Sequence, residues 1–346
     1  MILVTGGAGF IGSYVVDTLI DEGHEVRVLD SLLAAGGDGS RWLNPDAEFV
    51  QGDLADPDVV VRALGGVTAV CHQASMVGLG LDMRDIADYA RHNDLATAVL
   101  LKQLAASGFR GRLVLASSMV VYGEGAYRCQ AHGPIAPAPR APDRLAAGEF
   151  EPQCPACGDG LEPVAVQESA PLDPRNVYAA TKAHQEHLCF AFMRETGVPV
   201  TALRYHNVYG PRMPRDTPYS GVAAIFASSL AAGRAPQVFE DGLQLRDFVH
   251  VHDVARANVI ALTTDEPVPG AFNVASGRPR TVREMADALA DAAGPGAPRP
   301  QITARFRLGD VRHVFASAER AAAVLGFRAA VDFDAGMSEL SAALTA

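Results

Sequence analysis

The sequence predicts an α/β protein with a doubly wound parallel sheet, a smaller C-terminal lobe and a Cys/His-rich insertion. Short apolar segments alternate with amphipathic segments over residues 1–123, and a glycine-rich turn follows the first apolar segment. Residues 124–167 break this rhythm and are rich in Pro, Gly, Cys and His. Alternating strands and helices are typical of a parallel sheet that is covered by helices on both faces.

The expected elements alternate strictly in the first part of the chain. We expect strands at residues 2–5, 25–30, 49–53, 67–72 and 112–117, with helices at about 10–22 and 93–107. A long helical pattern resumes at 178–195, and another strand is expected at 200–205. The remainder mixes short elements with loops, which suits a smaller lobe.

Composition excludes several classes of protein. The net charge of -11 argues against a nucleic-acid-binding protein, which needs a basic face for phosphates. No apolar run reaches the roughly 18 residues that span a bilayer, and Met1 leads directly into an apolar segment with no basic leader. We therefore expect a cytoplasmic protein without a membrane partner, in which the five cysteines stay reduced.

A glycine motif predicts a dinucleotide site. Gly6, Gly9 and Gly12 lie between the first strand and the first helix. Glycines there allow a tight turn and a close approach to a pyrophosphate, and the helix N-terminus adds N–H donors and a positive dipole end. Asp30 ends the second strand, where a carboxylate accepts bonds from ribose hydroxyls and repels a 2′-phosphate. This predicts a Rossmann-type domain that binds NAD; the alternative is that Asp30 only closes a turn.

Tyr178 and Lys182 are four residues apart, so on a helix they share one face. A neighbouring Lys and the cationic nicotinamide ring both favour the phenolate, which would make the tyrosine a base near neutral pH. Ser117 and Ser118 stand at the end of the fifth predicted strand, where a hydroxyl can share the hydrogen bond to the substrate oxygen. The alternative is that these residues only pack in the core. Their occurrence together with a dinucleotide-binding domain disfavours that alternative.

These motifs resemble those of the extended short-chain dehydrogenases/reductases that act on nucleotide sugars, a family of NAD-dependent epimerases and dehydratases. The matching segments extend over nearly the whole chain outside the insertion. They are residues 6–12, Asp30, and residues 52–54, 72–74, 117–123, 178–182, 203–212, 246–253 and 272–277.

The resemblance implies a division of the chain and a set of roles. It implies an NAD-binding domain from residues 1–123 and 168–206, the insertion at 124–167, and a nucleotide-sugar lobe mainly at 207–346 that returns to the first domain around 246–277. Ser118 would be the catalytic hydroxyl, Tyr178 the general base and acid, and Lys182 its partner. The residues expected to contact the cofactor are Gly6, Gly9, Phe10, Ile11, Gly12, Asp30, Asp53, Leu54, Gln73, Ala74, Asn93, Tyr178, Lys182 and Tyr205.

The substrate ligands follow from the same resemblance. They are Ser75, Ser118, His206, Asn207, Arg246, Arg307 and Asp310. Asn207, Arg246 and Arg307 would hold the nucleotide diphosphate, and Asp310 the nucleoside ribose. Three alternatives stay open: Arg246 and Arg307 could be surface charges, Asp53 a loop carboxylate, and His206 either a sugar contact or a core residue. The sugar pocket is expected around residues 75–82, 206 and 213–221.

The residues after Ser118 favour one reaction within the family. Dehydratases and decarboxylases that resemble this family carry acidic residues directly after the catalytic hydroxyl. This chain has Met119 and Val120 at those positions. Epimerisation at C4 needs no such acid. We expect a dTDP-deoxysugar such as dTDP-L-rhamnose as substrate. The alternatives are a UDP-hexose or UDP-hexuronate 4-epimerase, a nucleotide-sugar 4-ketoreductase or dehydrogenase, and a non-enzymatic regulatory protein that senses NAD.

The insertion carries a possible metal site. Cys129 and His132 form one pair and Cys154 and Cys157 a second, and each pair is followed by Gly. Three thiolates and one imidazole supply four tetrahedral zinc ligands and leave no open catalytic position. The alternatives are a flexible loop with unrelated cysteines, or a disulfide or redox pair. The insertion resembles that of dTDP-L-rhamnose 4-epimerases. The helices at 93–107 and 178–194 carry apolar residues beyond one face, and the resemblance implies that they pair into a homodimer.

Overall fold

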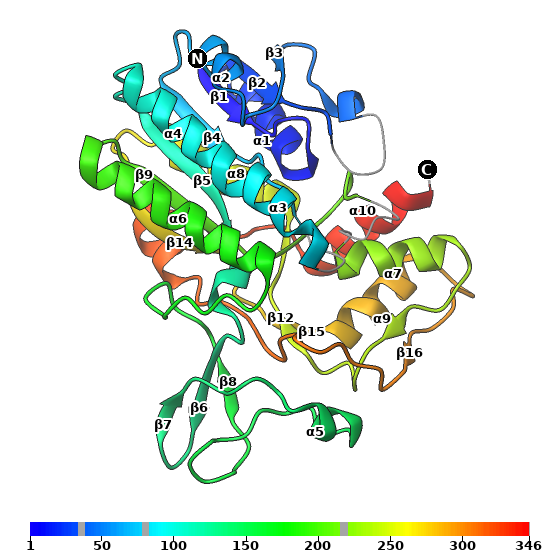
Figure 1. Cartoon of the computed structure of the whole chain (residues 1–346). Helices are drawn as coiled ribbons and strands as arrows, with labels where there is room; N and C mark the ends of the chain where they lie inside the picture. The colour runs from blue at the N-terminus through cyan, green and yellow to red at the C-terminus, as the bar shows by residue number, and fades with distance from the viewer. Residues whose placement is uncertain (34–38, 78–82, 215–220, 346) are drawn as a thin grey trace.

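A seven-stranded parallel sheet organises the protein (Figure 1). The computed structural model describes residues 1–33, 39–77, 83–214 and 221–345. The strand order is β14-β9-β5-β4-β1-β2-β3, and each neighbouring pair is parallel. The strands are β1 (Ile2–Thr5), β2 (Val26–Asp30), β3 (Glu48–Gln51), β4 (Ala69–His72), β5 (Arg112–Ser118), β9 (Val200–Tyr205) and β14 (Gly270–Val274). The order reverses beside β1, which confirms the doubly wound α/β fold predicted from the sequence.

Helices cover both faces of this sheet. Helices α1 (Phe10–Asp21) and α8 (Val251–Thr263) pack together on one face. The other face is covered by α2 (Pro57–Ala63), α4 (Ala96–Ala106) and α6 (Val177–Thr196). Successive strand residues point to opposite faces, so Leu3 and Val4 are both fully buried but belong to different cores. Burial on both faces explains why the central strands β1 and β5 are mostly apolar rather than alternating, whereas the edge strand β3 is largely exposed.

The C-terminal lobe is built from three helices and short strand pairs. Its helices are α7 (Val222–Ala231), α9 (Val282–Ala292) and α10 (Phe333–Thr345), which share an apolar core of their own. The paired strands are β10 (Asn207–Tyr209) with β13 (Phe248–His250), β11 (Gln237–Val238) with β16 (Gln301–Ile302), and β12 (Leu245–Arg246) with β15 (Arg280–Thr281). The lobe lies beside the sheet domain, at the lower right of Figure 1.

The insertion extends away from the sheet domain and forms a small sheet of its own (Figure 1). Strand β6 (Ala126–Cys129) lies between β7 (Gly133–Ile135) and β8 (Glu162–Val164), and both pairs are antiparallel. A short helix, α5 (Pro142–Ala146), follows β7. The apolar cluster under this sheet contains few residues, which are Tyr127, Cys129, Cys154, Leu161 and Ile135.

The helix predicted at 93–107 begins earlier and is irregular. Helix α3 (Ile86–Tyr89) leads into a π-helical segment, Ala90–Leu95, before α4. A π turn carries an extra residue and is common at functional sites. Here it contains Asn93, whose buried side chain bonds to a neighbouring loop and to α6. None of the helices in the described ranges is both long and apolar enough to cross a bilayer.

Candidate active site

The glycine turn has the geometry of an anion cradle. Gly6 has φ of +70°, and a Cβ on Gly12 would lie 2.1 Å from the carbonyl oxygen of Gly6, so neither position accepts a side chain. Gly9 precedes α1 and has no side chain to cap it, so Gly9 leaves the first N–H groups of the helix, at Phe10 and Ile11, uncapped. Such a terminus binds phosphate oxygens. These features fit the pyrophosphate of a dinucleotide.

Two carboxylates lie at the carboxyl ends of β2 and β3. Asp30 accepts hydrogen bonds from the backbone N–H groups of Ala8 (3.0 Å) and Leu32 (2.8 Å). This fixes the carboxylate at the end of β2 beside the turn, where the sequence predicts a ribose ligand. Asp53 pairs with Arg91 at 2.7 Å. Burial raises the pKa of Asp53, but its bonds with Ala55 and Arg91 outweigh this and hold that pKa below its usual value.

Tyr178, Lys182 and Ser118 come together at the carboxyl end of β5. Asn176 caps α6 by accepting the N–H of Ala179 at 2.8 Å, so the helix begins directly before Tyr178. The Lys182 ammonium nitrogen lies 5.9 Å from the centre of the Tyr178 ring and donates to the Ala116 carbonyl at 2.9 Å. Ser118 is the last residue of β5 and is hydrogen-bonded to Tyr178. The sequence predicted this triad.

The protonation of these groups differs from the sequence-based expectation. Burial raises the pKa of Tyr178, and the hydrogen bond with Ser118 opposes this only in part. Burial also lowers the pKa of Lys182 to about 7. The lysine neighbour alone therefore does not lower the pKa of Tyr178 as the sequence suggested. Burial disfavours both the Tyr178 phenolate and the Lys182 ammonium group. Phenolate formation depends on further positive charge placed beside the ring.

Asn93 joins the catalytic helix to the loop after β4. Its amide nitrogen donates to the Met76 carbonyl (3.0 Å) and to Thr181 (2.9 Å), and its amide oxygen accepts from the Met76 N–H (2.7 Å) and the Ser75 hydroxyl (3.0 Å). These contacts fill both donor positions and both acceptor positions of the Asn93 side-chain amide. Asn93 thus ties the π-helical segment to Thr181 on α6 and positions Ser75, an expected substrate ligand.

A second polar cluster lies under the cofactor region. The Gln73 amide donates to Tyr205 and to Asn258, both at 2.9 Å, and the Tyr205 hydroxyl also donates to Asn258 at 2.8 Å. Ala74 donates its N–H to the Thr5 hydroxyl at 3.3 Å. These bonds hold the ends of β1, β4 and β9 together. Sequence motifs pointed to Gln73, Ala74 and Tyr205, while Asn258 on α8 was missed.

A buried ion pair supports the catalytic helix, and the sequence analysis did not predict it. Glu186 lies one turn after Lys182 and pairs with Arg204 at 2.7 and 2.9 Å. Glu186 also accepts the hydroxyl of Ser117, and Arg204 donates to the Tyr122 hydroxyl at 2.8 Å. The pair locks α6 against β5 and β9. Since its partners are far apart in sequence, no local pattern could have revealed it.

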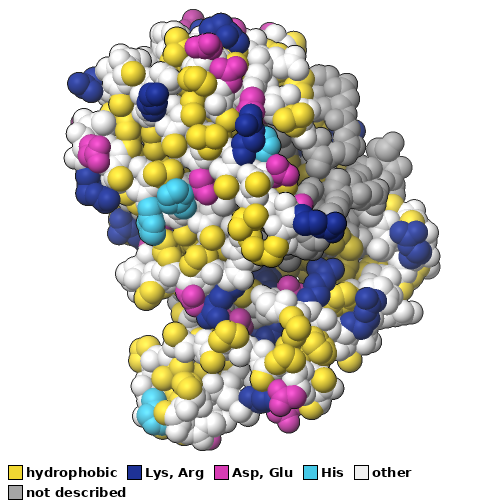
Figure 2. All heavy atoms as spheres, in the orientation of Figure 1, with side chains coloured by type: hydrophobic (Ala, Val, Ile, Leu, Met, Phe, Trp, Pro, Cys, Tyr) yellow, Lys and Arg dark blue, Asp and Glu magenta, His cyan; other side chains and the backbone are white. Residues whose placement is uncertain are grey.

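Arg246, Arg307 and Asp310 gather where the lobe meets the sheet domain. Burial raises the pKa of the Asp310 carboxyl, and the nearby charges of Arg307 and Arg246 act against that rise. Arg307 also lies over the Phe239 ring at 5.1 Å. Figure 2 shows Lys and Arg side chains collected where the sheet domain, the lobe and the insertion meet. A local basic surface of this kind suits an anionic ligand in an otherwise acidic protein.

Asn207 and His206 lie at the junction of β9 and β10. The buried side-chain oxygen of Asn207 has no hydrogen-bond partner among the described residues, which is costly unless a ligand supplies a donor. His206 is buried, and burial lowers its imidazole pKa to about 3, so the ring is neutral. Leu54 is buried beside β3. The pocket residues 78–82 and 215–220 that the sequence singled out lie outside the described residues.

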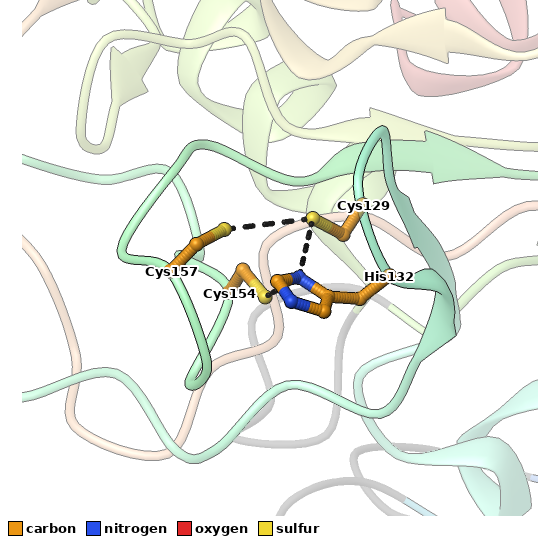
Figure 3. Close-up of side chains that lie close together, drawn as sticks. All are labelled: Cys129, His132, Cys154 and Cys157. Carbon is orange, nitrogen blue, oxygen red and sulfur yellow. Dashed lines mark hydrogen bonds between the residues drawn. The ribbon is translucent and has the colours of Figure 1, made fainter.

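The four Cys and His side chains of the insertion converge on one point (Figure 3). The Cys129 sulfur lies 3.7 Å from the Cys157 sulfur, and the His132 Nδ1 lies 3.4 Å from Cys129 and 3.6 Å from Cys154. Tetrahedral zinc with ordinary bond lengths requires about 3.8 Å between sulfurs and about 3.6 Å between sulfur and nitrogen. The donor set and its spacing therefore fit a zinc ion.

Comparisons with known proteins identify the family of this chain. A model of the NAD dependent epimerase/dehydratase family matches residues 2–142 and 154–275. The chain therefore belongs to that family, as the sequence motifs indicated. A dTDP-L-rhamnose 4-epimerase of Burkholderia thailandensis is 32% identical over 98% of this chain and 93% of its own length.

Solved structures give the same result. The UDP-glucose 4-epimerase of Thermus thermophilus, in complex with NAD, is 31% identical with a TM-score of 0.79 and covers 99% of this chain and 98% of its own. The UDP-glucose 4-epimerase of Thermotoga maritima, with UDP-glucose, is 30% identical with a TM-score of 0.80 and covers 99% of this chain and 97% of its own. The chain is thus similar over its whole length to nucleotide-sugar epimerases.

Proposed function

We propose that the protein is an NAD-dependent nucleotide-sugar 4-epimerase. The observation that carries the proposal is the convergence of Tyr178, Lys182 and Ser118 at the edge of the sheet where the glycine turn also lies. The two residues after Ser118 are Met119 and Val120, which offer no acid for removing water or carbon dioxide. Oxidation and reduction at one carbon need only a proton shuttle and a hydride carrier.

NAD, when bound, would supply the acceptor and donor of the hydride. The glycine turn and the α1 N-terminus would hold its pyrophosphate, Asp30 its adenosine ribose, and Lys182 its nicotinamide ribose. The fit rests on the side-chain-free cradle at Gly6 and Gly12 and on the anchored Asp30 carboxylate.

Tyr178 would move the proton at the sugar 4-oxygen. The Ser118 hydroxyl would orient that oxygen, and Tyr178 would accept its proton as the C4–H bond breaks. The resulting 4-keto sugar turns in the pocket, and Tyr178 returns the proton when hydride is delivered to the other face. Arg246, Arg307 and Asn207 would hold the diphosphate meanwhile, so that the sugar turns while the nucleotide stays bound.

Incubation with candidate nucleotide sugars and no added coenzyme tests this proposal. We expect inversion at C4 of one member of a panel of dTDP-L-rhamnose, UDP-glucose, UDP-galactose, UDP-glucuronate and UDP-N-acetylglucosamine. Proton NMR detects inversion through the changed coupling at H4. Stoichiometric NADH formation instead of inversion would support the alternative of a dehydrogenase or ketoreductase, and NAD binding without any turnover would support an NAD-sensing regulatory protein.

For the substrate we propose a dTDP-deoxysugar such as dTDP-L-rhamnose. The support is the 32% identity to a dTDP-L-rhamnose 4-epimerase over nearly the whole chain, together with the insertion. The UDP-glucose 4-epimerases of similar identity make a UDP-hexose or UDP-hexuronate the second candidate.

We also propose that the insertion binds one structural zinc ion through Cys129, His132, Cys154 and Cys157. The interatomic distances match tetrahedral coordination, and Gly133 and Gly158 take positive φ values after each pair, which lets the chain curl around the metal. The apolar cluster of the insertion is small. A metal would therefore supply much of its folding free energy.

Metal analysis of the purified protein tests the zinc proposal. We expect one zinc ion per chain, and its loss in the double variant Cys154→Ser/Cys157→Ser. His250, His252 and Glu339 form another cluster whose ligand atoms lie within 4.8 Å of one another, so His252→Ala is the matched control and should keep the zinc. Well under one zinc per wild-type chain would overturn the proposal.

Two further proposals concern assembly and location. We propose a homodimer formed through α4 and α6, which lie side by side and carry apolar residues that pack against the core yet stay partly exposed; Val99, Leu188 and Met193 are examples. We also propose a cytoplasmic location, supported by five unpaired cysteines.

A further inference from the structure

The insertion is joined to the nucleotide-binding lobe by buried charged groups. Arg140, near α5, pairs with Glu240 at 2.8 Å, and the two side chains are only 6% and 3% exposed. The same guanidinium donates to the backbone carbonyl of Asp310 at 2.7 Å. Asp310 is an expected ligand of the nucleoside, so the insertion contacts the backbone of a binding residue directly.

A second contact lies two residues further along the lobe. Glu151 of the insertion accepts from Arg312 at 2.6 and 2.9 Å and lies 2.8 Å from the His313 ring nitrogen. Burial raises the pKa of Glu151, but His313 and Arg312 outweigh that effect and lower it to about 2, so the carboxylate is charged at neutral pH. The Arg312 side chain is fully buried and also pairs with Asp241 at 2.7 and 2.8 Å.

The segment held in this way positions Arg246. The Arg246 guanidinium donates to the carbonyls of Val311 (2.7 Å), Arg312 (2.9 Å) and Leu245 (2.8 Å). Three of its five N–H donors are thereby used by backbone. In the part of the chain that the structure describes, no carboxylate lies within salt-bridge distance of Arg246, so the remaining donors suit an anionic ligand.

We propose that the insertion is a clamp that fixes the diphosphate-binding arginine through the 310–313 segment. Arg140 and Glu151 contact the segment 310–313 directly. A backbone carbonyl of that segment, at Arg312, in turn accepts a hydrogen bond from Arg246. Arg140 and Glu151 are positioning residues that touch no substrate atom. The inference rests on the proposed function, because it takes Arg246 as the diphosphate ligand.

The Cys/His cluster closes the loop that carries both positioning residues. Cys129 ends β6 before this loop, and Cys154 follows Glu151 by three residues. Strand β6 also carries Tyr127, whose hydroxyl accepts the His313 N–H at 3.1 Å. Joining the two ends of the loop lowers the entropy lost when it docks on the lobe. Metal binding at the cluster should therefore tighten nucleotide binding at a distance.

Nucleotide affinity of the whole protein tests the clamp. The variant Arg140→Gln should weaken binding of dTDP or UDP by about ten-fold in calorimetry and raise KM, while the NAD content and kcat stay close to wild type. Arg144→Gln is the matched control, because Arg144 lies on α5 four residues after Arg140 and, among the described residues, forms its ion pair with the exposed Glu149. It should bind both nucleotides as the wild type does.

Chelation of the wild-type protein supplies a second, independent test. Removal of the metal from the cluster should weaken dTDP or UDP binding to the same extent while the NAD content is retained, and added zinc should restore it. Unchanged nucleotide affinity in Arg140→Gln, or after confirmed loss of the metal, overturns the clamp. Absence of dTDP and UDP binding by the wild type would instead overturn the proposed function.

Discussion

Replacing Tyr178 with Phe is expected to lower kcat by about a thousand-fold, because the variant keeps the ring but loses the group that moves the proton at the sugar 4-oxygen. The NAD content and the affinity for dTDP or UDP should stay within about two-fold of wild type, since neither the glycine turn nor the diphosphate site involves this hydroxyl. Steady-state kinetics and calorimetry on the same preparation measure both quantities.

Tyr14→Phe is the matched control for this variant. Tyr14 is buried on α1, and its hydroxyl donates to the Pro211 carbonyl at 3.3 Å, away from α6. Its removal should cost about 1 kcal/mol of stability and leave kcat unchanged. A Tyr178→Phe enzyme with more than half of the wild-type kcat would contradict the assignment of Tyr178 as the acid and base.

Replacing Gly12 with Ala is expected to remove the cofactor and to destabilise the fold. The new Cβ would lie 2.1 Å from the Gly6 carbonyl oxygen and 2.9 Å from the Gly7 Cα, both of which are backbone atoms that no rotamer change can move. Helix α1 must therefore shift away from the turn, at a cost of about 3 kcal/mol. Urea unfolding and the NAD content of the purified variant measure the two effects.

The control for Gly12 is a glycine with free space around it. A Cβ on Gly65 would meet no heavy atom within 4 Å, so Gly65→Ala should keep its NAD and gain at most about 1 kcal/mol from the stiffer unfolded chain. Full retention of NAD by Gly12→Ala, at wild-type stability, would show that the turn is not the pyrophosphate cradle.

Sequence reasoning predicted the placement of residues that lie close together in one short segment. The glycine turn, the four-residue spacing of Tyr178 and Lys182, and the two cysteine-containing pairs of the insertion are all local patterns, and the structure gives each the expected shape. The parallel sheet followed from the alternation of apolar segments in the same way.

Features that depend on distant contacts were not predicted. Arg140 is 170 residues from Asp310 in the chain, and Glu151 is 161 residues from Arg312. A lone charged residue in a Pro-rich segment has no periodicity that distinguishes it from a solvated side chain. The pKa expectation for Tyr178 was incomplete for a related reason, because desolvation depends on how the whole pocket is packed and not on the neighbouring lysine alone.

A deuterium label at C4 of the substrate tests the central claim most directly. The protein should be incubated without added coenzyme with the member of the panel that it inverts, carrying deuterium on C4. If one enzyme-held NAD carries the hydride away from C4 and back to it, the inverted product keeps the deuterium at C4, as mass spectrometry and the missing H4 signal would show. Loss of the label to water, or inversion only when NADH is supplied, would contradict the account.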